Sequence, residues 1–469
     1  MKTSRRNFLK LSSLTGIGLA GNTVLKNEDI FSSDNLYHPG SQHFNMCGYA
    51  APRINTVRIG FIGLGNRGPG AVERMTHIEG TEIKALCDIR PERTNYVKKK
   101  LNAAAHRPEI FTGNTEEWRK MCERPDIDLV YIATPWDLHT PMAVYAMEQG
   151  KHVCVEVPCA KTVEECWQLV ETSERTKKHC IILENCCYDF FELLTLNMAR
   201  QGLFGEIVHG EGAYIHTLLE GNFSKDKYYN MWRLKENFRN GNLYPTHGLG
   251  PIAQIMNINR GDKMDYLVAV ASNDFQMKAM ANNLALNDDF YKQFANKKYR
   301  GNMNTTTIRT NNGRTIMLQH DVTSPVVYSR IHKISGTKGS CLKYPLPGKI
   351  SFGHEDWLGE NELKTLEHKY TPPIVQKVGE MAKQVGGHGG MDFLMDWRTI
   401  DCLRNGLPMD MDVYDAALWS AIGPLSERSV SNRSNSVDIP DFTSGSWKTN
   451  QPVDISLEKG ASTKVIIGS

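Results

Sequence analysis

The sequence predicts an α/β fold: a doubly wound parallel sheet, followed by a C-terminal α+β domain with a large open, mainly antiparallel sheet. Two observations predict it. Residues 56–187 alternate short apolar runs with helical segments, which is typical of a parallel sheet with helices on both faces. From residue 188 the apolar pattern changes to alternating strands with hairpin signals, which favours an antiparallel sheet.

Length and composition agree with this organisation. The 469 residues include 55 Lys+Arg and 52 Asp+Glu, giving a net charge of +3, and 40 % are hydrophobic. These values are globular, and the length allows two or three domains. The near-zero net charge argues against a nucleic-acid partner, which requires a concentrated basic surface. No interior run reaches the roughly 18 apolar residues of a membrane span. Eleven cysteines without a CxxC pair argue against a metal site or a disulfide scaffold.

The first residues predict an export signal. Ser4-Arg5-Arg6-Asn7-Phe8-Leu9-Lys10 form a twin-arginine motif, and the apolar stretch 11–20 that follows is too short to span a membrane. Twin-arginine export carries folded proteins, which suits a protein that acquires a cofactor in the cytoplasm. We therefore expect a signal peptide over residues 1–31, an N-terminal arm over 32–55 and a periplasmic location.

A glycine turn follows the first expected strand. Residues 56–62 are a β-branched apolar run, and Gly63, Gly65 and Gly68 follow at once in the turn 63–68. These glycines permit close approach of backbone N–H groups to a pyrophosphate at a helix N-terminus. The second strand, 82–88, ends in Asp88, at the spacing of a carboxylate that accepts ribose hydroxyls. Because this carboxylate repels a 2′-phosphate, residues 56–187 predict a Rossmann domain that binds NAD rather than NADP.

The remaining elements of this half follow in order. The runs 128–135, 152–158 and 181–185 are the further expected strands, and the expected helices cover 141–149 and 162–177. Thr162 and Glu165 form a capping box at the start of the second helix. A ligand is expected at the carboxyl ends of the parallel strands.

The second half, residues 188–430, is expected to be a strand-rich α+β domain with few helices that carries the substrate. Its strand-like runs are 207–216, 265–272, 305–310, 314–321 and 330–335, and Asn311-Asn312-Gly313 is a hairpin signal. Helices are expected over 190–202 and 391–402. Residues 431–469 are rich in Ser, Asn and Pro and are expected to form a surface segment.

At this point the chain resembles the Gfo/Idh/MocA oxidoreductases over roughly residues 56–430. The resemblance is carried by the turn 63–68, by Asp88, and by the segments 132–139 (IATPWDLH) and 150–158 (GKHVCVEVP). In the dehydrogenases of this family the last motif reads Glu-Lys-Pro, and its lysine handles the proton of the substrate hydroxyl. Val157 stands at the lysine position and cannot relay a proton.

With valine in place of this lysine, the sequence is similar to glycoside hydrolase family 109, the NAD-dependent α-N-acetylgalactosaminidases. Further matches are 184–188 (ENCCY), 231–233 (MWR), 244–251 (YPTHGLGP) and 386–392 (GGHGGMD). The resemblance implies a tightly bound NAD that is recycled through oxidation, elimination, addition of water and reduction, so that no pair of catalytic carboxylates is required. The implied substrate is a glycan with terminal α-linked N-acetylgalactosamine. The alternatives are an exported NAD-dependent sugar dehydrogenase and a non-catalytic member of the fold.

The candidate catalytic residue is His247, because a histidine can exchange a proton near neutral pH; the alternative is a structural histidine at a helix start. Tyr188 and Tyr328 are candidates for proton handling, or else packing residues. Glu156 is a cofactor-positioning residue or a catalytic carboxylate.

The resemblance also supplies the full set of contacts. The cofactor contacts are Gly63, Gly65, Asn66, Arg67, Gly68, Asp88, Trp136, Asp137, Leu138, His139, Glu156, Val157 and Asn185. The substrate contacts are Tyr214, Arg233, Tyr244, Pro245, Thr246, His247 and Tyr328. Tyr228, Tyr229 and Trp232 could stack on a sugar ring or pack in a core. Open-sheet domains of this family often form dimers, so a homo-oligomer is an open expectation.

Overall fold

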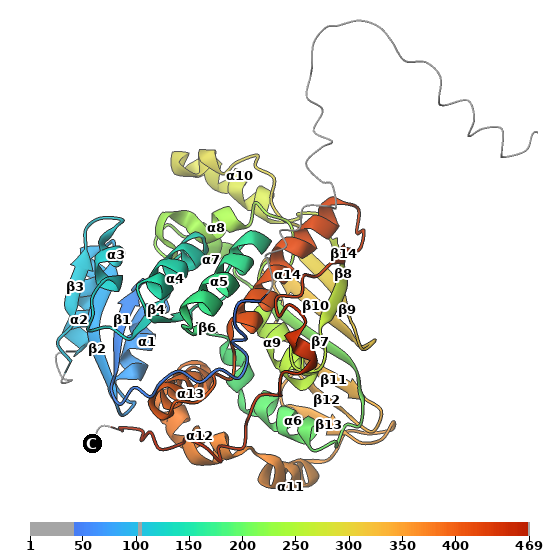
Figure 1. Cartoon of the computed structure of the whole chain (residues 1–469). Helices are drawn as coiled ribbons and strands as arrows, with labels where there is room; N and C mark the ends of the chain where they lie inside the picture. The colour runs from blue at the N-terminus through green and yellow to red at the C-terminus, as the bar shows by residue number, and fades with distance from the viewer. Residues whose placement is uncertain (1–41, 102–105, 468–469) are drawn as a thin grey trace, which may run out of the picture. The chain divides into compact units, whose positions relative to one another are not determined.

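The computed structural model describes residues 42–101 and 106–467 (Figure 1). The expected signal peptide, residues 1–31, and the first part of the expected arm lie outside the described residues. The described part of the arm packs on the folded chain: the His43 N–H donates to Glu174 at 2.8 Å and the Met46 N–H to the Tyr414 hydroxyl at 3.1 Å.

The first sheet has six strands in the order β3-β2-β1-β4-β5-β6, and every neighbouring pair is parallel. In this doubly wound order, β2 and β3 are added on one side of β1, and β4, β5 and β6 on the other. The two directions part between β1 and β4, and a crevice opens at the carboxyl ends of these strands. Its strands are β1 (Val57–Ile62), β2 (Thr81–Asp88), β3 (Glu109–Thr112), β4 (Leu129–Ile132), β5 (His152–Val155) and β6 (Cys180–Ile182).

Helices connect these strands. They are α1 (Gly68–Met75), α2 (Pro91–Lys100), α3 (Glu117–Cys122), η2 (Trp136–Leu138), α4 (His139–Glu148), α5 (Val163–Thr176) and η3 (Asn185–Tyr188). The capping box expected at α5 is present, with the Thr162 hydroxyl accepting from the Glu165 N–H. The predicted doubly wound sheet is confirmed.

The second sheet has eight strands in the order β13-β12-β11-β7-β10-β9-β8-β14, and only the β10–β7 pair is parallel. The predicted hairpin joins β9 to β10. The strands are β7 (Ile207–Ile215), β8 (Met264–Ala271), β9 (Met303–Thr310), β10 (Thr315–Asp321), β11 (His332–Gly336), β12 (Ser340–Lys343), β13 (Lys349–Ser351) and β14 (Val437–Asp438). The large, mainly antiparallel sheet is thus confirmed.

The second half contains more helix than its strand-rich sequence pattern predicts (Figure 1). Its helices are α6 (Phe190–Arg200), α7 (Leu219–Phe223), η4 (Tyr229–Met231), α8 (Trp232–Glu236), α9 (Thr246–Ile255), α10 (Met277–Asn287), η5 (Asp289–Gln293), α11 (Glu360–Tyr370), α12 (Pro373–Val385), η6 (His388–Gly390), α13 (Met391–Asn405), α14 (Val413–Ser431) and η7 (Ser446–Lys448). The expectation of few helices was wrong. The helices expected over 190–202 and 391–402 are present as α6 and α13, whereas α14, which the sequence pattern did not indicate, is buried almost all round and lacks the two-sided pattern by which surface helices are recognised.

Helix α9 lies unusually close to strand β7 because two glycines face each other. A Cβ atom on Gly212 of β7 would lie 2.4 Å from the Gly248 carbonyl oxygen, and one on Gly248 would lie 2.3 Å from the Ala213 nitrogen. Only hydrogen fits at both positions. The first turn of α9, which carries His247, is therefore held directly against the strand that carries Tyr214.

Helix α14 ties the two halves together through three buried serine hydroxyls. Ser420 accepts the Cys159 N–H at 3.0 Å, Ser426 accepts the Asn242 N–H at 2.8 Å, and Ser429 accepts the Ala269 N–H at 2.9 Å. The first of these donors belongs to the parallel-sheet half and the last to β8 of the second sheet.

Candidate active site

The glycine turn after β1 has the shape required for a dinucleotide. Gly63 adopts a φ of +90°, and a Cβ there would lie 2.5 Å from the Ala133 carbonyl oxygen. A Cβ on Gly68 would lie 2.1 Å from the Gly63 carbonyl oxygen, whereas one on Gly65 meets only the Arg90 guanidinium, at 3.7 Å. The turn is thus tight on its inner side and open at Gly65, where a pyrophosphate can approach the backbone.

Asp88 stands at the end of β2, beside this turn. Its carboxylate accepts the Leu64 N–H at 2.8 Å and the Arg90 N–H at 2.9 Å. It therefore fixes the turn and, from the same position, can accept ribose hydroxyls. The residues present fit a nicotinamide dinucleotide.

A bridging segment, residues 219–236, crosses the carboxyl edge of the parallel sheet. Four residues that follow β1, β2, β4 and β5 contact it in turn. The Asn66 amide donates to the Lys227 carbonyl at 2.8 Å, Arg90 lies 4.9 Å from the ring of Tyr229, Trp136 lies 5.5 Å from Trp232, and Lys161 binds Glu236 at 2.7 Å. The segment thus spans the edge at which a parallel sheet binds its ligand.

Two expected cofactor residues, Arg67 and Asn185, meet at one buried carboxylate, Asp392. Arg67 binds Glu156 at 3.0 Å and Asp392 at 3.3 Å, and the Asn185 amide donates to Asp392 at 2.5 Å. The His388 ring contacts Asp392 at 2.9 Å. Burial alone would raise the pKa of Asp392, but His388, Arg67 and Arg74 outweigh burial and hold this pKa well below its ordinary value.

The expected substrate residues form one aromatic cluster. Tyr214 lies 4.5 Å from Tyr244 and 5.4 Å from His247, measured between ring centroids, and Tyr244 lies 4.9 Å from His247. Tyr328 joins the cluster at 6.3 Å from Tyr214. Pro245 and Thr246 form the start of α9 and so set the direction of His247.

Arg233 enters this cluster from α8. Its guanidinium carbon lies 5.3–5.8 Å from the centroids of four rings, which belong to Trp136, Tyr228, Trp232 and Tyr244. Within the described part of the chain its side chain forms no hydrogen bond and no ion pair. A cation held by rings alone retains its hydrogen-bond donors for a ligand.

His247 is bound on one side by a buried acid. Its Nδ1 atom lies 2.8 Å from Oε1 and 2.9 Å from Oε2 of Glu184, whose side chain is 0 % exposed. Its Nε2 atom forms no hydrogen bond to the described residues. This corrects the alternative of a histidine bound to backbone at a helix start, because its partner is a carboxylate.

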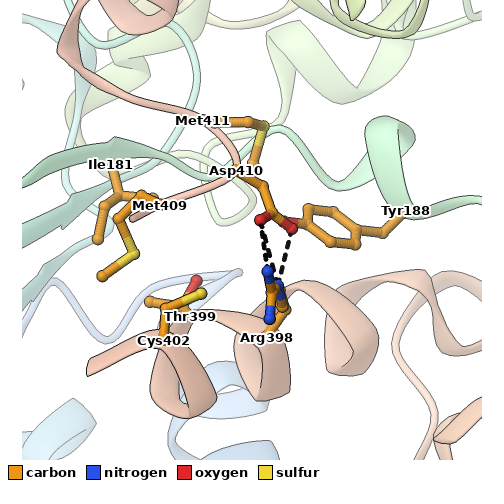
Figure 2. A pocket seen from close by; sticks show the side chains of 8 residues that line it. All are labelled: Ile181, Tyr188, Arg398, Thr399, Cys402, Met409, Asp410 and Met411. Atoms are coloured by element: carbon orange, nitrogen blue, oxygen red, sulfur yellow. Dashed lines mark hydrogen bonds and ion pairs between the residues drawn. The ribbon is translucent and has the colours of Figure 1, made fainter. Parts of the chain in front are cut away.

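Tyr188 points away from this cluster. Its hydroxyl donates to Asp410 at 3.0 Å, and Asp410 in turn binds Arg398 (Figure 2). No contact given by the described residues joins Tyr188 to His247, so the structure does not bring these two catalytic candidates together. A sequence cannot indicate to which side a residue of a 3-10 turn points.

The other expected cofactor residues divide between buried and exposed positions. His139 is buried, and its two ring nitrogens lie 2.7 and 2.8 Å from the Pro158 and Thr134 carbonyl oxygens. Val157 is buried, Asp137 pairs with Lys161, and Leu138 is exposed. His139 therefore shapes the loop and leaves neither nitrogen free for a ligand.

A metal ion has weak support. In the described ranges, Glu184, Cys186 and His247 offer three ligand atoms within 4.8 Å of one another. However, the Arg330 guanidinium lies 3.0 Å from the Cys186 sulfur, and its charge opposes a second cation.

Among the helices of the described residues, none is both long and apolar enough to cross a membrane.

Three residues of the site were not among the sequence-based candidates. Glu184 binds His247, which lies 63 residues away along the chain, and Asp392 binds Asn185, which lies 207 residues away. His388 stands between glycines of positive φ in the loop 386–390, and this run of four glycines around one histidine was the signal that could have found it.

Comparison with known proteins agrees with this geometry. Residues 57–183 match the oxidoreductase family NAD-binding Rossmann fold, and residues 188–449 match the C-terminal domain of glycosyl hydrolase 109. Glycosyl hydrolase family 109 protein 1 of Phocaeicola vulgatus is 49 % identical over 414 residues, covering 84 % of this chain and 86 % of the relative. A family 109 protein of a Shewanella species is 45 % identical, covering 96 % of this chain and 98 % of the relative.

Solved structures share the fold at low identity. Levoglucosan dehydrogenase in complex with NADH and L-sorbose is 18 % identical with a TM-score of 0.61, and the match covers 83 % of this chain and 100 % of that chain. Myo-inositol dehydrogenase from Lactobacillus casei, in complex with NAD(H) and myo-inositol, is 15 % identical with a TM-score of 0.57, covering 83 % and 99 %. With its NAD-binding Rossmann domain and its matching C-terminal domain, the chain belongs to glycosyl hydrolase family 109.

Proposed function

We propose that this glycosyl hydrolase releases terminal α-linked N-acetylgalactosamine from glycans and uses a tightly bound NAD that is returned to its starting state in each turnover. The supporting observation is the cluster in which Tyr244 contacts His247, Tyr214 and Arg233. Bound NAD would supply the hydride acceptor, and later the hydride donor, for carbon 3 of the sugar.

The chain's own residues suit the remaining steps. A ketone at carbon 3 acidifies the proton on carbon 2, and removal of that proton lets the bond from carbon 1 to the aglycone break. The aglycone leaves with a proton, and water then adds to carbon 1. The Nε2 of His247, which no described residue hydrogen bonds, can exchange a proton, while the buried, apolar Val157 offers no such group.

The neighbouring side chains suit a sugar. The Arg233 donors, which have no hydrogen-bond partner among the described residues, can bind the acetamide carbonyl or a ring hydroxyl. Trp136 and Tyr244, whose ring centroids lie 5.7 Å apart, supply aromatic surface of the kind that lines ligand sites.

The test uses a chromogenic α-N-acetylgalactosaminide and purified protein without added NAD. We expect aglycone release, with the free sugar recovered at its original oxidation level. His247→Ala should lower turnover at least about tenfold with NAD content unchanged, because it removes a general acid–base. The fully exposed His354, on a loop after β13, supplies the matched control His354→Ala.

Other results would point elsewhere. NADH that accumulates with added sugar would favour the alternative, a sugar dehydrogenase. Wild-type turnover in His247→Ala would remove this residue from the mechanism.

We also propose that the protein is exported by the twin-arginine route and works in the periplasm. The support is the motif at residues 4–10. A recycled cofactor agrees with that location, because the enzyme would need no external supply of NAD.

A further inference from the structure

We propose that Glu184 is a positioning residue for His247: it holds the Nδ1–H of the imidazole, so that Nε2 faces the ligand as the proton acceptor. The proposal rests on the proposed function only for which proton His247 moves. The pairing itself is a property of the free protein and can be tested without substrate.

The geometry of the pair is that of an oriented base. Both Glu184 oxygens lie within 2.9 Å of Nδ1, so the carboxylate accepts a single N–H with both oxygens. The His247 side chain is 13 % exposed and that of Glu184 is 0 % exposed. One ring nitrogen is therefore fixed by the buried acid, and the other has no hydrogen-bond partner among the described residues, in a ring that contacts Tyr214 and Tyr244.

The backbone holds Glu184 firmly in this position. The residue follows β6 and precedes η3, and its Oε1 accepts the Cys186 N–H at 3.0 Å. A Cβ on Gly250 of α9 would lie 3.0 Å from Cγ of Glu184 and 2.9 Å from the Cys187 sulfur. The glycine thus lets α9 approach close enough for His247 to reach the acid.

Charge balance supports an ionised carboxylate. Burial alone raises the pKa of Glu184, but the interaction with His247 and the hydrogen bond from the Cys186 N–H outweigh burial and set this pKa below its ordinary value. Cys186 and Cys187 face the pair from η3, Tyr214 from β7, and Tyr244 from the segment before α9. Among the described residues that contact His247, Glu184 is the acid, so the carboxylate decides which ring nitrogen carries the proton.

A purely structural role is the alternative. In that case Glu184 would only tie the start of α9 to η3, and its replacement would cost stability without changing the protonation of the ring. The control for this alternative is Glu174, a buried acid on α5 that binds the Tyr414 hydroxyl at 2.8 Å and the His43 N–H at 2.8 Å.

The experiment compares Glu184→Gln, Glu184→Asp and Glu174→Gln as NAD-loaded proteins. The tautomer of His247 is read from its ring ¹⁵N shifts, assigned by the signal that disappears in His247→Ala. Wild type and Glu174→Gln should carry the proton on Nδ1, whereas Glu184→Gln should lose this preference. In the glycoside assay, Glu184→Gln should lower kcat about 100-fold with KM little changed, and Glu184→Asp should recover part of the loss.

The outcomes separate the two proposals. A changed tautomer in an enzyme that cleaves no glycoside would sustain the pairing and defeat the proposed function. Glycoside cleavage with an unchanged tautomer and unchanged kcat in Glu184→Gln would overturn the pairing. If Glu184→Gln does not fold, the wild-type spectrum still decides, because a proton on Nε2 at neutral pH contradicts the proposal.

Discussion

Arg233 shows how a single residue prepares this site for a ligand. The guanidinium remains charged at all relevant pH values, and within the described chain it is surrounded by rings rather than acids. A partly buried charge without a hydrogen-bonding partner costs free energy in the unliganded protein. A ligand acceptor recovers that cost on binding, so the residue contributes to affinity more than to folding.

We expect Arg233→Met to raise KM at least about tenfold, because hydrogen bonds from a charged donor contribute about 1.5–3 kcal/mol. The thermal midpoint should stay the same or rise, since a poorly compensated cation is removed. Lys235→Met, an exposed site on the same helix, is the control for both measurements. An unchanged KM would show that Arg233 does not contact the sugar.

At this scale, a sequence predicts residue types better than their partners. The aromatic and histidine residues of the substrate site could be named because they lie in short motifs. Glu184 and Asp392 also lie in short motifs, but their roles could not be assigned, because their partners His247 and Asn185 lie 63 and 207 residues away and only the fold brings them together. Tyr188 lies in a motif as well, yet its hydroxyl points to Asp410.

At the scale of elements, the contact between α9 and β7 sets the position of His247. The two glycines allow the backbones to approach without side chains between them. The alternation of strand and helix made the first sheet predictable. The buried α14 was harder to foresee, because residues that face protein on all sides leave no periodic signal.

Gly212→Ala should disturb this contact. Its new methyl group would lie 2.4 Å from the Gly248 carbonyl oxygen, so α9 must move away. We expect the unfolding free energy to fall by about 1–3 kcal/mol, and kcat to fall as His247 shifts. Urea unfolding and the glycoside assay measure these effects. Gly353→Ala, where no atom lies within 4 Å, is the control, and equal behaviour of the two variants would refute the argument.

At the scale of the whole molecule, buried acids make stability depend on pH in two directions. Burial raises the pKa of Asp396 to about 6, although Arg74 donates to it at 2.7 Å. The folded state therefore binds more protons than the unfolded state between about pH 4 and 6, so this group lowers stability as pH rises through that window. Asp392, whose pKa is lowered, acts in the opposite direction, and its contribution is lost as pH falls below about 4.

Asp396→Asn should remove the first of these effects. The unfolding free energy falls as the pH rises from 4 to 7, and in the variant this fall should be smaller than in wild type by up to about 3 kcal/mol. Chemical denaturation at both pH values measures the difference. The exposed Asp289→Asn provides the reference, and a variant with the wild-type pH dependence would assign the effect to other groups.

The three serines of α14 limit how the cofactor-binding half could be exchanged between members of the family. The helix that accepts backbone donors from both halves comes from the far end of the chain, after every strand of the second sheet except β14. The cofactor-binding half therefore cannot be transplanted as residues 57–183 alone. Such a graft would face a foreign α14, whose serines must meet Cys159 on one side and Ala269 on the other. In a chimera, a dinucleotide half must be inherited together with this helix.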